Sequence, residues 1–375
     1  MRSDLILEDT TLRDGEQSPG VAFSKETKLA IFDALVAAGV KWIEAGIAVM
    51  GGEELATLEA LLERKNEATL VGWNRGVKAD VKQTIDLGFE AIHIGLPASK
   101  LHLKDSVRGK SRGWLIESAM DLIKYAKDRG VFVSVSAEDA GRTELAFLQE
   151  YAGKVHEAGA DRLRLSDTIG IMTPEQYGEK IGAVAAACDI DLMCHTHNDF
   201  GLAVANTIAG LKAGARYFHC TVNAIGERAG MSDIAQVVFA LKYLYGYDLG
   251  VDGRELKRSS ALVARACGHP PPPWHPIVGE NVFSHESGIH VNGMLKNKKT
   301  FEPFPAEAAA GERRFVIGKH SGRATLAYYL EQRGVQASDE VLQICLDRVR
   351  QLSIDKASAV TTDELHCIYR EVAAR

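Results

Sequence analysis

Two histidines stand one residue apart in the stretch CHTHNDFG, residues 194–201. Side chains at positions i and i+2 of an extended strand point to the same face, so His195 and His197 could offer two imidazole nitrogens to one cation. A carboxylate would complete a mixed nitrogen and oxygen ligand set of the kind that holds Zn, Mn, Mg or Fe(II). The candidate for that carboxylate is Asp14, in the stretch EDTTLRDGEQ near the N-terminus.

About three protein ligands would leave positions on the ion open for a substrate. Such an ion can act as a Lewis acid on an α-keto acid that chelates it through carbonyl and carboxylate. Arg13 would then place a fixed positive charge beside a carbonyl oxygen that becomes an alkoxide. Asn223 could add an amide oxygen to the ligand set. For each of these side chains the alternative is structural: an ion pair, or a polar group satisfied at the end of a strand.

Residues so far apart in the chain can meet only if the fold brings them together, and the hydrophobic pattern indicates how. Up to about residue 246, short apolar runs alternate with amphipathic stretches, and a glycine that could end a helix precedes several of the apolar runs. These glycines are Gly39, Gly88, Gly130, Gly159 and Gly214. The apolar runs that we expect to be strands begin near Leu5, Lys41, Leu70, Ala91, Val131, Arg162, Asp191 and Arg216.

Eight strands that alternate with helices predict parallel pairing and an α/β fold, the (β/α)8 TIM barrel. An open doubly wound sheet is the second possibility, but no glycine-rich dinucleotide fingerprint follows the first predicted strand. In a TIM barrel the chemistry gathers at the carboxyl ends of the strands. The main polar residues predicted at or near those ends are Arg13, Asp14, Gln17, Glu44, His93, Ser134, Ser136, Glu138, Asp139, Asp167, Thr168, His195, His197 and Asn223.

The pattern changes after about residue 250. Four consecutive prolines, Pro270–Pro273, cannot continue a helix and are typical of a semi-rigid spacer. We therefore expect three parts: a catalytic barrel over 1–262, a linker subdomain with a catalytic loop over 263–320, and a small helical subdomain over 321–375. Two helical patterns, GRATLAYYLEQRG and SDEVLQICLDRVRQLS, make up the last part, which we expect to pack on a neighbouring subunit.

Composition narrows the choice of partners and compartment. The 375 residues carry a net charge of −6 and no basic block, which argues against a nucleic-acid partner. No stretch reaches the ~18 apolar residues needed to cross a bilayer, and the N-terminus lacks the apolar core of a signal peptide. The six cysteines are scattered without a CxxC pair, which in a chain of this size indicates reduced thiols. We therefore expect a cytoplasmic protein that acts on small molecules.

Five stretches together resemble the family of α-isopropylmalate and homocitrate synthases. They are DTTLRDGEQSPGVAFS, HTHNDFGLAVANT, NAIGERAGM, SGIHVNG and GKHSGR, in this order within residues 4 to about 325. The resemblance implies an acyltransferase that carries out a metal-dependent Claisen condensation of acetyl-CoA with an α-keto acid and then releases CoA by hydrolysis. It also implies a homodimer with swapped C-terminal segments, in which a loop of one subunit serves the other.

The same resemblance implies a role for each motif residue. The implied metal ligands are Asp14, His195 and His197, with Asn223 close by. Arg13 would stabilise the keto oxygen, while Glu138 and His290 would act in removing a proton from the acetyl methyl group. The residues implied to line the keto-acid pocket are Gln17, Glu44, His93, Ser136 and Thr168.

Within the family, GEQSPGVAFS and IEAGIAVMG look most like the homocitrate synthases of nitrogen fixation, whose acceptor is 2-oxoglutarate. One departure concerns the distal carboxylate of that acceptor. Lysine-pathway homocitrate synthases carry an arginine on the fifth strand, where this sequence has Ser134. The alternatives are a 2-isopropylmalate or citramalate synthase without a leucine-sensing domain, a carbon–carbon lyase of the HMG-CoA lyase type, and a scaffold that binds metal only for stability.

Overall fold

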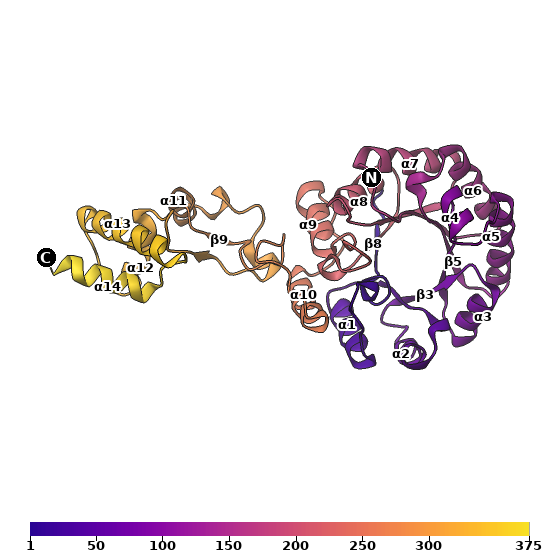
Figure 1. Ribbon diagram of the computed structural model, residues 1–375, viewed down its shortest axis with the longest axis horizontal. Helices are drawn as coiled ribbons and strands as arrows, with labels where there is room; N and C mark the ends of the chain where they lie inside the picture. The colour runs from indigo at the N-terminus through magenta and orange to yellow at the C-terminus, as the bar shows by residue number, and fades with distance from the viewer. Residues whose placement is uncertain (375) are drawn as a thin grey trace. The chain divides into compact units, whose positions relative to one another are not determined.

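Eight parallel strands close into a barrel in the computed structural model, which describes residues 1–374 (Figure 1). The strands are β1 (Ile6–Asp9), β2 (Trp42–Gly46), β3 (Thr69–Arg75), β4 (Ala91–Gly95), β5 (Phe132–Ala137), β6 (Arg162–Asp167), β7 (Asp191–Thr196) and β8 (Tyr217–Cys220). Pairing of β1 with β8, from Ile6 opposite Tyr217 to Asp9 opposite Cys220, closes the ring. Each strand begins within one residue of its predicted start, and the TIM-barrel prediction is confirmed.

Residues 1–271 also form ten α-helices, which lie outside the ring of strands (Figure 1). They are α1 (Lys25–Ala37), α2 (Gly52–Leu62), α3 (Lys78–Leu87), α4 (Lys100–Asp105), α5 (Arg112–Lys127), α6 (Leu145–Glu157), α7 (Pro174–Ala187), α8 (Ala203–Lys212), α9 (Ile234–Tyr245) and α10 (Gly253–Cys267). A capping box between Thr173 and Gln176 starts α7 ahead of Pro174. Gly88 ends α3 with a φ of 107°, and the other four predicted helix-ending glycines also have positive φ.

The barrel has an apolar outer side and a largely polar interior. Alternate strand residues such as Ile92, Val133 and Leu163 are fully buried between strands and helices. The residues at the intervening positions include Glu8, Glu44, His93, Ser134, Arg162, Arg164 and His219, which are at most 2% exposed. Because a buried charge is costly unless it is paired, this interior is stable only if its acids and bases contact one another.

Aromatic rings surround the deepest of these charges. The Arg162 guanidinium lies 4.7 Å from the ring centroid of Tyr217, 5.5 Å from that of Phe132 and 5.6 Å from that of Trp42. These rings belong to residues at or near the amino-terminal ends of their strands, so they close the barrel on the side away from the strand carboxyl ends. The opposite end is left for polar side chains.

The chain divides into two compact units, Met1–Pro271 and Pro272–Arg375. The second contains a two-stranded sheet of β9 (Ser284–His285) and β10 (Arg314–Phe315), and the helices α11 (Gly288–Lys296), α12 (Arg323–Glu331), α13 (Asp339–Lys356) and α14 (Thr362–Ala373). Its apolar core includes Leu326, Leu330, Cys345, Val349 and Leu365. The expected barrel boundary at residue 262 falls inside α10, and α14 is a helix that the sequence analysis did not predict.

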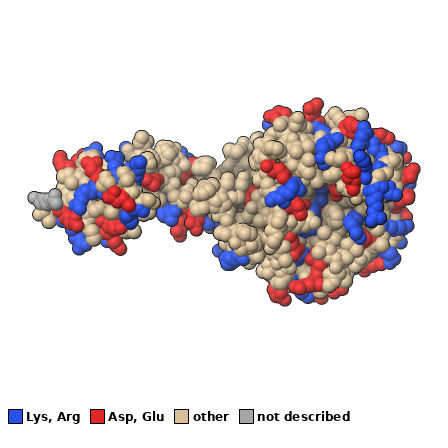
Figure 2. Space-filling model, viewed as in Figure 1, with Lys and Arg blue, Asp and Glu red and all other residues tan. Residues whose placement is uncertain are grey.

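Acidic and basic side chains are interspersed over both units on the face that Figure 2 shows, and basic side chains gather over the α4–α5 part of the barrel. All six cysteines are free thiols. Among the described residues, no helix is both long enough and apolar enough to cross a membrane.

Candidate metal and keto-acid site

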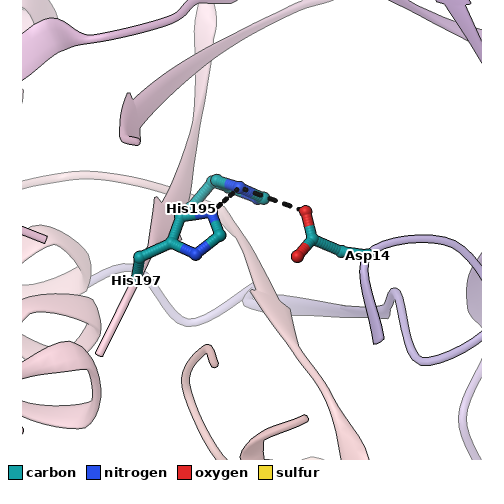
Figure 3. A group of neighbouring side chains, drawn as sticks. All are labelled: Asp14, His195 and His197. Atoms are coloured by element: carbon teal, nitrogen blue, oxygen red, sulfur yellow. Dashed lines mark hydrogen bonds and ion pairs between the residues drawn. The ribbon is translucent and has the colours of Figure 1, made fainter. Parts of the chain in front are cut away.

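Asp14, His195 and His197 bring one carboxylate and two imidazoles together at the carboxyl end of the barrel (Figure 3). Asp14 lies in the loop after β1, His195 belongs to β7, and His197 follows that strand. The His195 Nε2 atom is 3.2 Å from His197 Nε2 and 3.8 Å from Asp14 Oδ2. All three side chains are buried. The residues that the sequence pattern placed at one site therefore do lie together.

The donor atoms of this triad fit a divalent metal ion. Asp14 Oδ1 is buried without a hydrogen-bond partner among the described residues, although buried polar atoms nearly always have one. Metal–nitrogen bonds of ~2.1 Å at tetrahedral or octahedral angles place two nitrogens about 3.0–3.4 Å apart, and the two Nε2 atoms have that separation. Burial lowers the pKa of both His195 and His197, which keeps the imidazoles neutral and their lone pairs available at neutral pH.

A chain of hydrogen bonds fixes the tautomer of His195. Burial opposes ionisation of Glu8, but Arg162, His219 and Arg164 hold the pKa of this carboxyl at about 2, so it is a carboxylate that only accepts hydrogen bonds. His219 Nε2 therefore donates to Glu8 Oε1 at 2.8 Å. Burial lowers the pKa of His219 to about 4, so its Nδ1 carries no proton and accepts from His195 Nδ1 at 2.8 Å. The lone pair of His195 then lies on Nε2, which faces His197 and Asp14.

Buried ion pairs hold the two arginines nearest the triad. Glu44 accepts from Arg13 Nε, from Arg164 Nη2 at 2.6 Å and from the Thr10 hydroxyl at 2.8 Å. Arg13 Nη1 also donates to Asp14 Oδ2 at 2.7 Å. Breaking one buried pair typically costs about 3–5 kcal/mol, so these contacts fix the two guanidinium groups firmly. Burial works against the charge of Arg13, but Glu44 and Asp14 raise its pKa, and it remains a cation beside the triad.

A second group of potential ligands, Glu8, Glu44 and His219, lies deeper in the barrel. Arg162 and Arg164 already neutralise its two carboxylates, with contacts of 2.7 Å to Glu8 and 2.6 Å to Glu44. A cation placed there would meet two guanidinium groups, so the group acts as the support of the upper triad.

A cavity of about 190 Å³ lies beside the triad. It is lined by Arg13, Asp14, Gln17, Trp73, His93, Ser136, Glu138, Arg164, Ser166, Thr168, His195, His197, Glu227 and Arg228. Nine of the twelve predicted site residues are among them. Glu44, Asn223 and His290 are the three that are not.

Each of these three residues has a clear position elsewhere. Glu44 lies beneath the cavity and orients Arg13 and Arg164, so it supports the pocket rather than lining it. Asn223, expected close to the metal ligands, instead directs its amide at α10: Nδ2 donates to the Ser260 carbonyl at 2.9 Å, and Oδ1 accepts from the Ser260 hydroxyl at 2.5 Å. His290 belongs to the second unit, where its exposed ring stacks on Phe301 with centroids 4.0 Å apart.

Glu138 is the lining residue best suited to take a proton. Desolvation raises the pKa of its carboxyl, although Arg13 and Arg164 partly oppose that rise. A carboxylate with a raised pKa is a stronger base than an exposed one. Its location at the end of β5 places this base in the same cavity as the triad.

Five lining residues were absent from the predicted set: Trp73, Arg164, Ser166, Glu227 and Arg228. A signal for Arg164 was present in the stretch RLRLSD, because two arginines alternate with leucines on a strand that is otherwise predicted to be buried. Arg228 contacts Asp199 at 2.8 Å and the Thr168 carbonyl at 2.7 Å, from a backbone with a φ of 54°. No simple sequence pattern predicts such a contact between loops.

Each of the two units matches a known protein family. Residues 4–263 match the family model described as HMGL-like, and residues 277–357 match the one described as homocitrate synthase post-HMGL domain-like. A 2-phosphonomethylmalate synthase of Streptomyces rubellomurinus is 63% identical over 374 residues, which cover 100% of each chain. Homocitrate synthase 1 of Nostoc sp. is 44% identical over 98% of this chain and 97% of its own, and 2-isopropylmalate synthase 2 of Caldanaerobacter subterraneus subsp. tengcongensis is 43% identical over 98% and 95%.

Solved structures of other proteins share the barrel fold. An HMG-CoA lyase of Bacillus subtilis superposes with a TM-score of 0.65 at 18% identity, over 74% of this chain and 97% of its own. One from Pseudomonas aeruginosa gives 0.65 at 21% identity, over 72% and 95%. At these identities the likeness concerns the fold alone.

Proposed function

The chain belongs to the HMGL-like family, and we propose that it is an acyltransferase that condenses acetyl-CoA with 3-phosphonopyruvate. The products would be 2-phosphonomethylmalate and CoA, with one water consumed when the thioester is hydrolysed. The observation that carries the choice of acceptor is the 63% identity to a 2-phosphonomethylmalate synthase along the whole chain. The homocitrate synthase and the 2-isopropylmalate synthase that cover 98% of this chain are 44% and 43% identical.

The acceptor follows from the name of that relative's product. 2-Phosphonomethylmalate is malate that carries a phosphonomethyl group on C2. Removing the two-carbon unit that an acetyl donor supplies leaves an α-keto acid whose third carbon bears the phosphonate. That compound is 3-phosphonopyruvate, so the atoms of the proposed reaction balance.

A homocitrate synthase that accepts 2-oxoglutarate is the second candidate. The polar cavity supports an anionic acceptor in either case, because Arg13, Arg164, His93 and Ser136 line it. The same lining counts against 2-oxoisovalerate, the acceptor of a 2-isopropylmalate synthase, because an isopropyl group could not satisfy these buried donors. It also counts against pyruvate, the acceptor of a citramalate synthase, which has no second anionic group.

The metal ion that the fold family implies would be held by Asp14, His195 and His197, and when bound it would polarise the keto carbonyl. Glu138 would remove a proton from the methyl group of acetyl-CoA. The resulting enolate carbon attacks the keto carbon, and Arg13 stabilises the oxygen as negative charge develops on it. Burial of Arg13, Asp14, His195 and His197 keeps water away from the enolate until the new carbon–carbon bond has formed.

We also propose that the enzyme acts as a homodimer, in which His290 of the partner subunit joins Glu138 in proton transfer. The support is that His290 is exposed in the second unit, away from any buried network of its own. An imidazole has two ring nitrogens and can both give a proton to a substrate and take one from it.

The test is a thiol-release assay with purified, metal-stripped protein to which Mg²⁺, Mn²⁺ or Zn²⁺ is returned. CoA release from acetyl-CoA should require a divalent ion and should be fastest with 3-phosphonopyruvate in a panel that also contains 2-oxoglutarate, 2-oxoisovalerate and pyruvate. In the absence of metal, the His195→Ala variant should have the same melting temperature as the wild type. With metal added, it should release no CoA. Preference for another keto acid would reject the proposed acceptor, and cleavage of a hydroxyacyl-CoA without condensation would reject a synthase.

A further inference from the structure

Outside the metal triad, two nitrogen atoms of cavity-lining residues have no partner among the described residues. His93 Nε2 and Arg164 Nε are buried and make no hydrogen bond to any described residue. Both residues line the cavity, and they are 0% and 2% exposed. Buried donors without partners are rare in folded proteins, and two in one cavity indicate that a ligand supplies the acceptors.

Neighbouring residues set the proton position on His93. Arg162 Nε donates to Ser134 Oγ at 3.0 Å, because a guanidinium has no acceptor. The Ser134 hydroxyl then has its own proton to donate to His93 Nδ1, at 2.9 Å. Burial lowers the pKa of His93, so the ring is neutral and its single proton lies on Nε2. The cavity thus receives a fixed N–H donor from β4.

The barrel places His93 away from the metal triad. Asp14 follows β1, and His195 and His197 come from the end of β7, with β8 between these two strands in the ring. β4, which carries His93, lies opposite β8 in an eight-stranded barrel. An acceptor whose keto-acid end is at the triad therefore extends its other end toward His93. Arg164 comes from β6, which pairs with β7 and so lies between the strands that carry the triad and β4.

We propose that Arg164 and His93 form the subsite for the distal anionic group of the acceptor, which under the proposed function is a phosphonate. The Arg164 guanidinium supplies the charge and the His93 Nε2–H supplies a directed hydrogen bond. Glu44 orients the arginine from below through its contact of 2.6 Å with Nη2, which leaves Nε for the ligand.

The pairing of β5 with β6 accounts for the missing arginine on the fifth strand. Ser134 stands opposite Arg162 and Ser136 opposite Arg164 in the register of these two strands. A small residue at Ser134 therefore leaves room for arginines that come from β6. The cation that we propose to recognise the acceptor is Arg164, on the neighbouring strand β6. Ser134 instead fixes His93 through the hydrogen bond to its Nδ1 atom.

The experiment measures binding of the acceptor to metal-loaded protein by titration calorimetry without acetyl-CoA. The ligands are 3-phosphonopyruvate, 2-oxoglutarate and pyruvate, which has no distal anion, and Mn²⁺ affinity is measured in parallel. His93→Leu removes the donor, His93→Gln restores an amide N–H, and Arg164→Met removes the charge. Arg75→Met is the matched control, because Arg75 lies at the end of β3, pairs with Asp80 and does not line the cavity.

We expect His93→Leu and Arg164→Met to weaken 3-phosphonopyruvate binding by about 10-fold to 100-fold, the usual loss for a hydrogen bond to a charged group. Pyruvate and Mn²⁺ affinities should change less than about 2-fold in His93→Leu, and His93→Gln should recover part of the loss. Because Arg164 also pairs with Glu44, the His93 variants, which alter a neutral side chain, decide the outcome if Arg164→Met fails to fold.

Three outcomes separate this inference from the proposed function. If the wild type prefers 2-oxoglutarate and the same variants lose that ligand selectively, the phosphonate acceptor is wrong and the subsite stands. If 3-phosphonopyruvate and pyruvate weaken equally, or if 3-phosphonopyruvate binding is unchanged, the subsite is wrong. A wild type that binds pyruvate as tightly as either anionic acceptor also overturns it.

Discussion

His219 Nδ1 lies 2.8 Å from His195 Nδ1, and the Nε2 atom on the other side of the same ring lies 2.8 Å from Glu8 Oε1. The three residues come from β8, β7 and β1, which are adjacent strands of the closed barrel. A carboxylate at the centre of the barrel therefore controls, through one intervening imidazole, which nitrogen of His195 is free to bind a cation.

Replacing His219 by leucine should weaken metal binding without touching a metal ligand. Loss of a group that orients a histidine ligand typically lowers metal affinity by about 10-fold to 100-fold. Calorimetric titration of Mn²⁺ into stripped protein measures this loss, with the exposed residue His156 changed to alanine as the control. Equal Mn²⁺ affinity in His219→Leu and the wild type would show that His195 does not depend on this contact.

Changing Glu138 to glutamine should lower kcat by about 10²-fold to 10⁴-fold, because the proposed base is lost. The KM for the keto acid should change little, since the metal triad and the distal subsite are retained. Desolvation raises the pKa of Glu138, so the wild-type rate should fall with acid at a pH above the usual carboxyl range of about 4. A kcat–pH profile with the same acidic limb in the variant would assign that limb to another group.

Asp9 gives a prediction about stability rather than activity. Burial raises the pKa of Asp9 to about 7 from its usual 3.8, although Thr11 donates to both carboxyl oxygens. Between these pH values the folded protein keeps a proton that the unfolded chain has released, so the free energy of unfolding falls as the pH rises.

In the Asp9→Asn variant, which has no ionisable group at this position, the free energy of unfolding should not show this fall with rising pH. Relative to the wild type, it should gain on the order of 3 kcal/mol in free energy of unfolding between about pH 5 and about pH 8. Urea denaturation of both proteins at the two pH values measures the difference. A constant difference between them would mean that Asp9 ionises normally in the folded state.

The swapped homodimer can be tested by mixing two inactive variants, Glu138→Gln and His290→Ala. If His290 serves the partner subunit, a mixed dimer contains one barrel with Glu138 and a histidine supplied by the other chain. Refolding an equal mixture should then restore up to about a quarter of wild-type activity. If both residues act within one chain, every site in the mixture lacks one of them and no activity returns.

The strands and the triad could be predicted because their signals are local and periodic. Apolar runs followed by a glycine-ended helix place every strand of the barrel, and the HxH spacing puts His195 and His197 on one face. Asp14 follows from the closure of the ring, since β1 and β7 both pair with β8.

The polar interior is what sequence reasoning missed. Glu44 lies near the end of β2 and was predicted to line the pocket. Its hydrogen bonds with Arg13 and Arg164 instead hold it beneath the cavity. Asn223 also follows a strand, yet its left-handed backbone, with a φ of 58°, directs the amide to Ser260. Which side chain faces the cavity at a strand end depends on such pairings across the barrel, which no spacing in the sequence reveals.

The most direct test of the metal site is anomalous diffraction from crystals of the protein grown with Mn²⁺ and 3-phosphonopyruvate. One peak should appear within bonding distance of Asp14, His195 and His197, with the keto acid chelating it and the phosphonate near Arg164. A peak at Glu8, Glu44 and His219, or none near His195, would contradict the account.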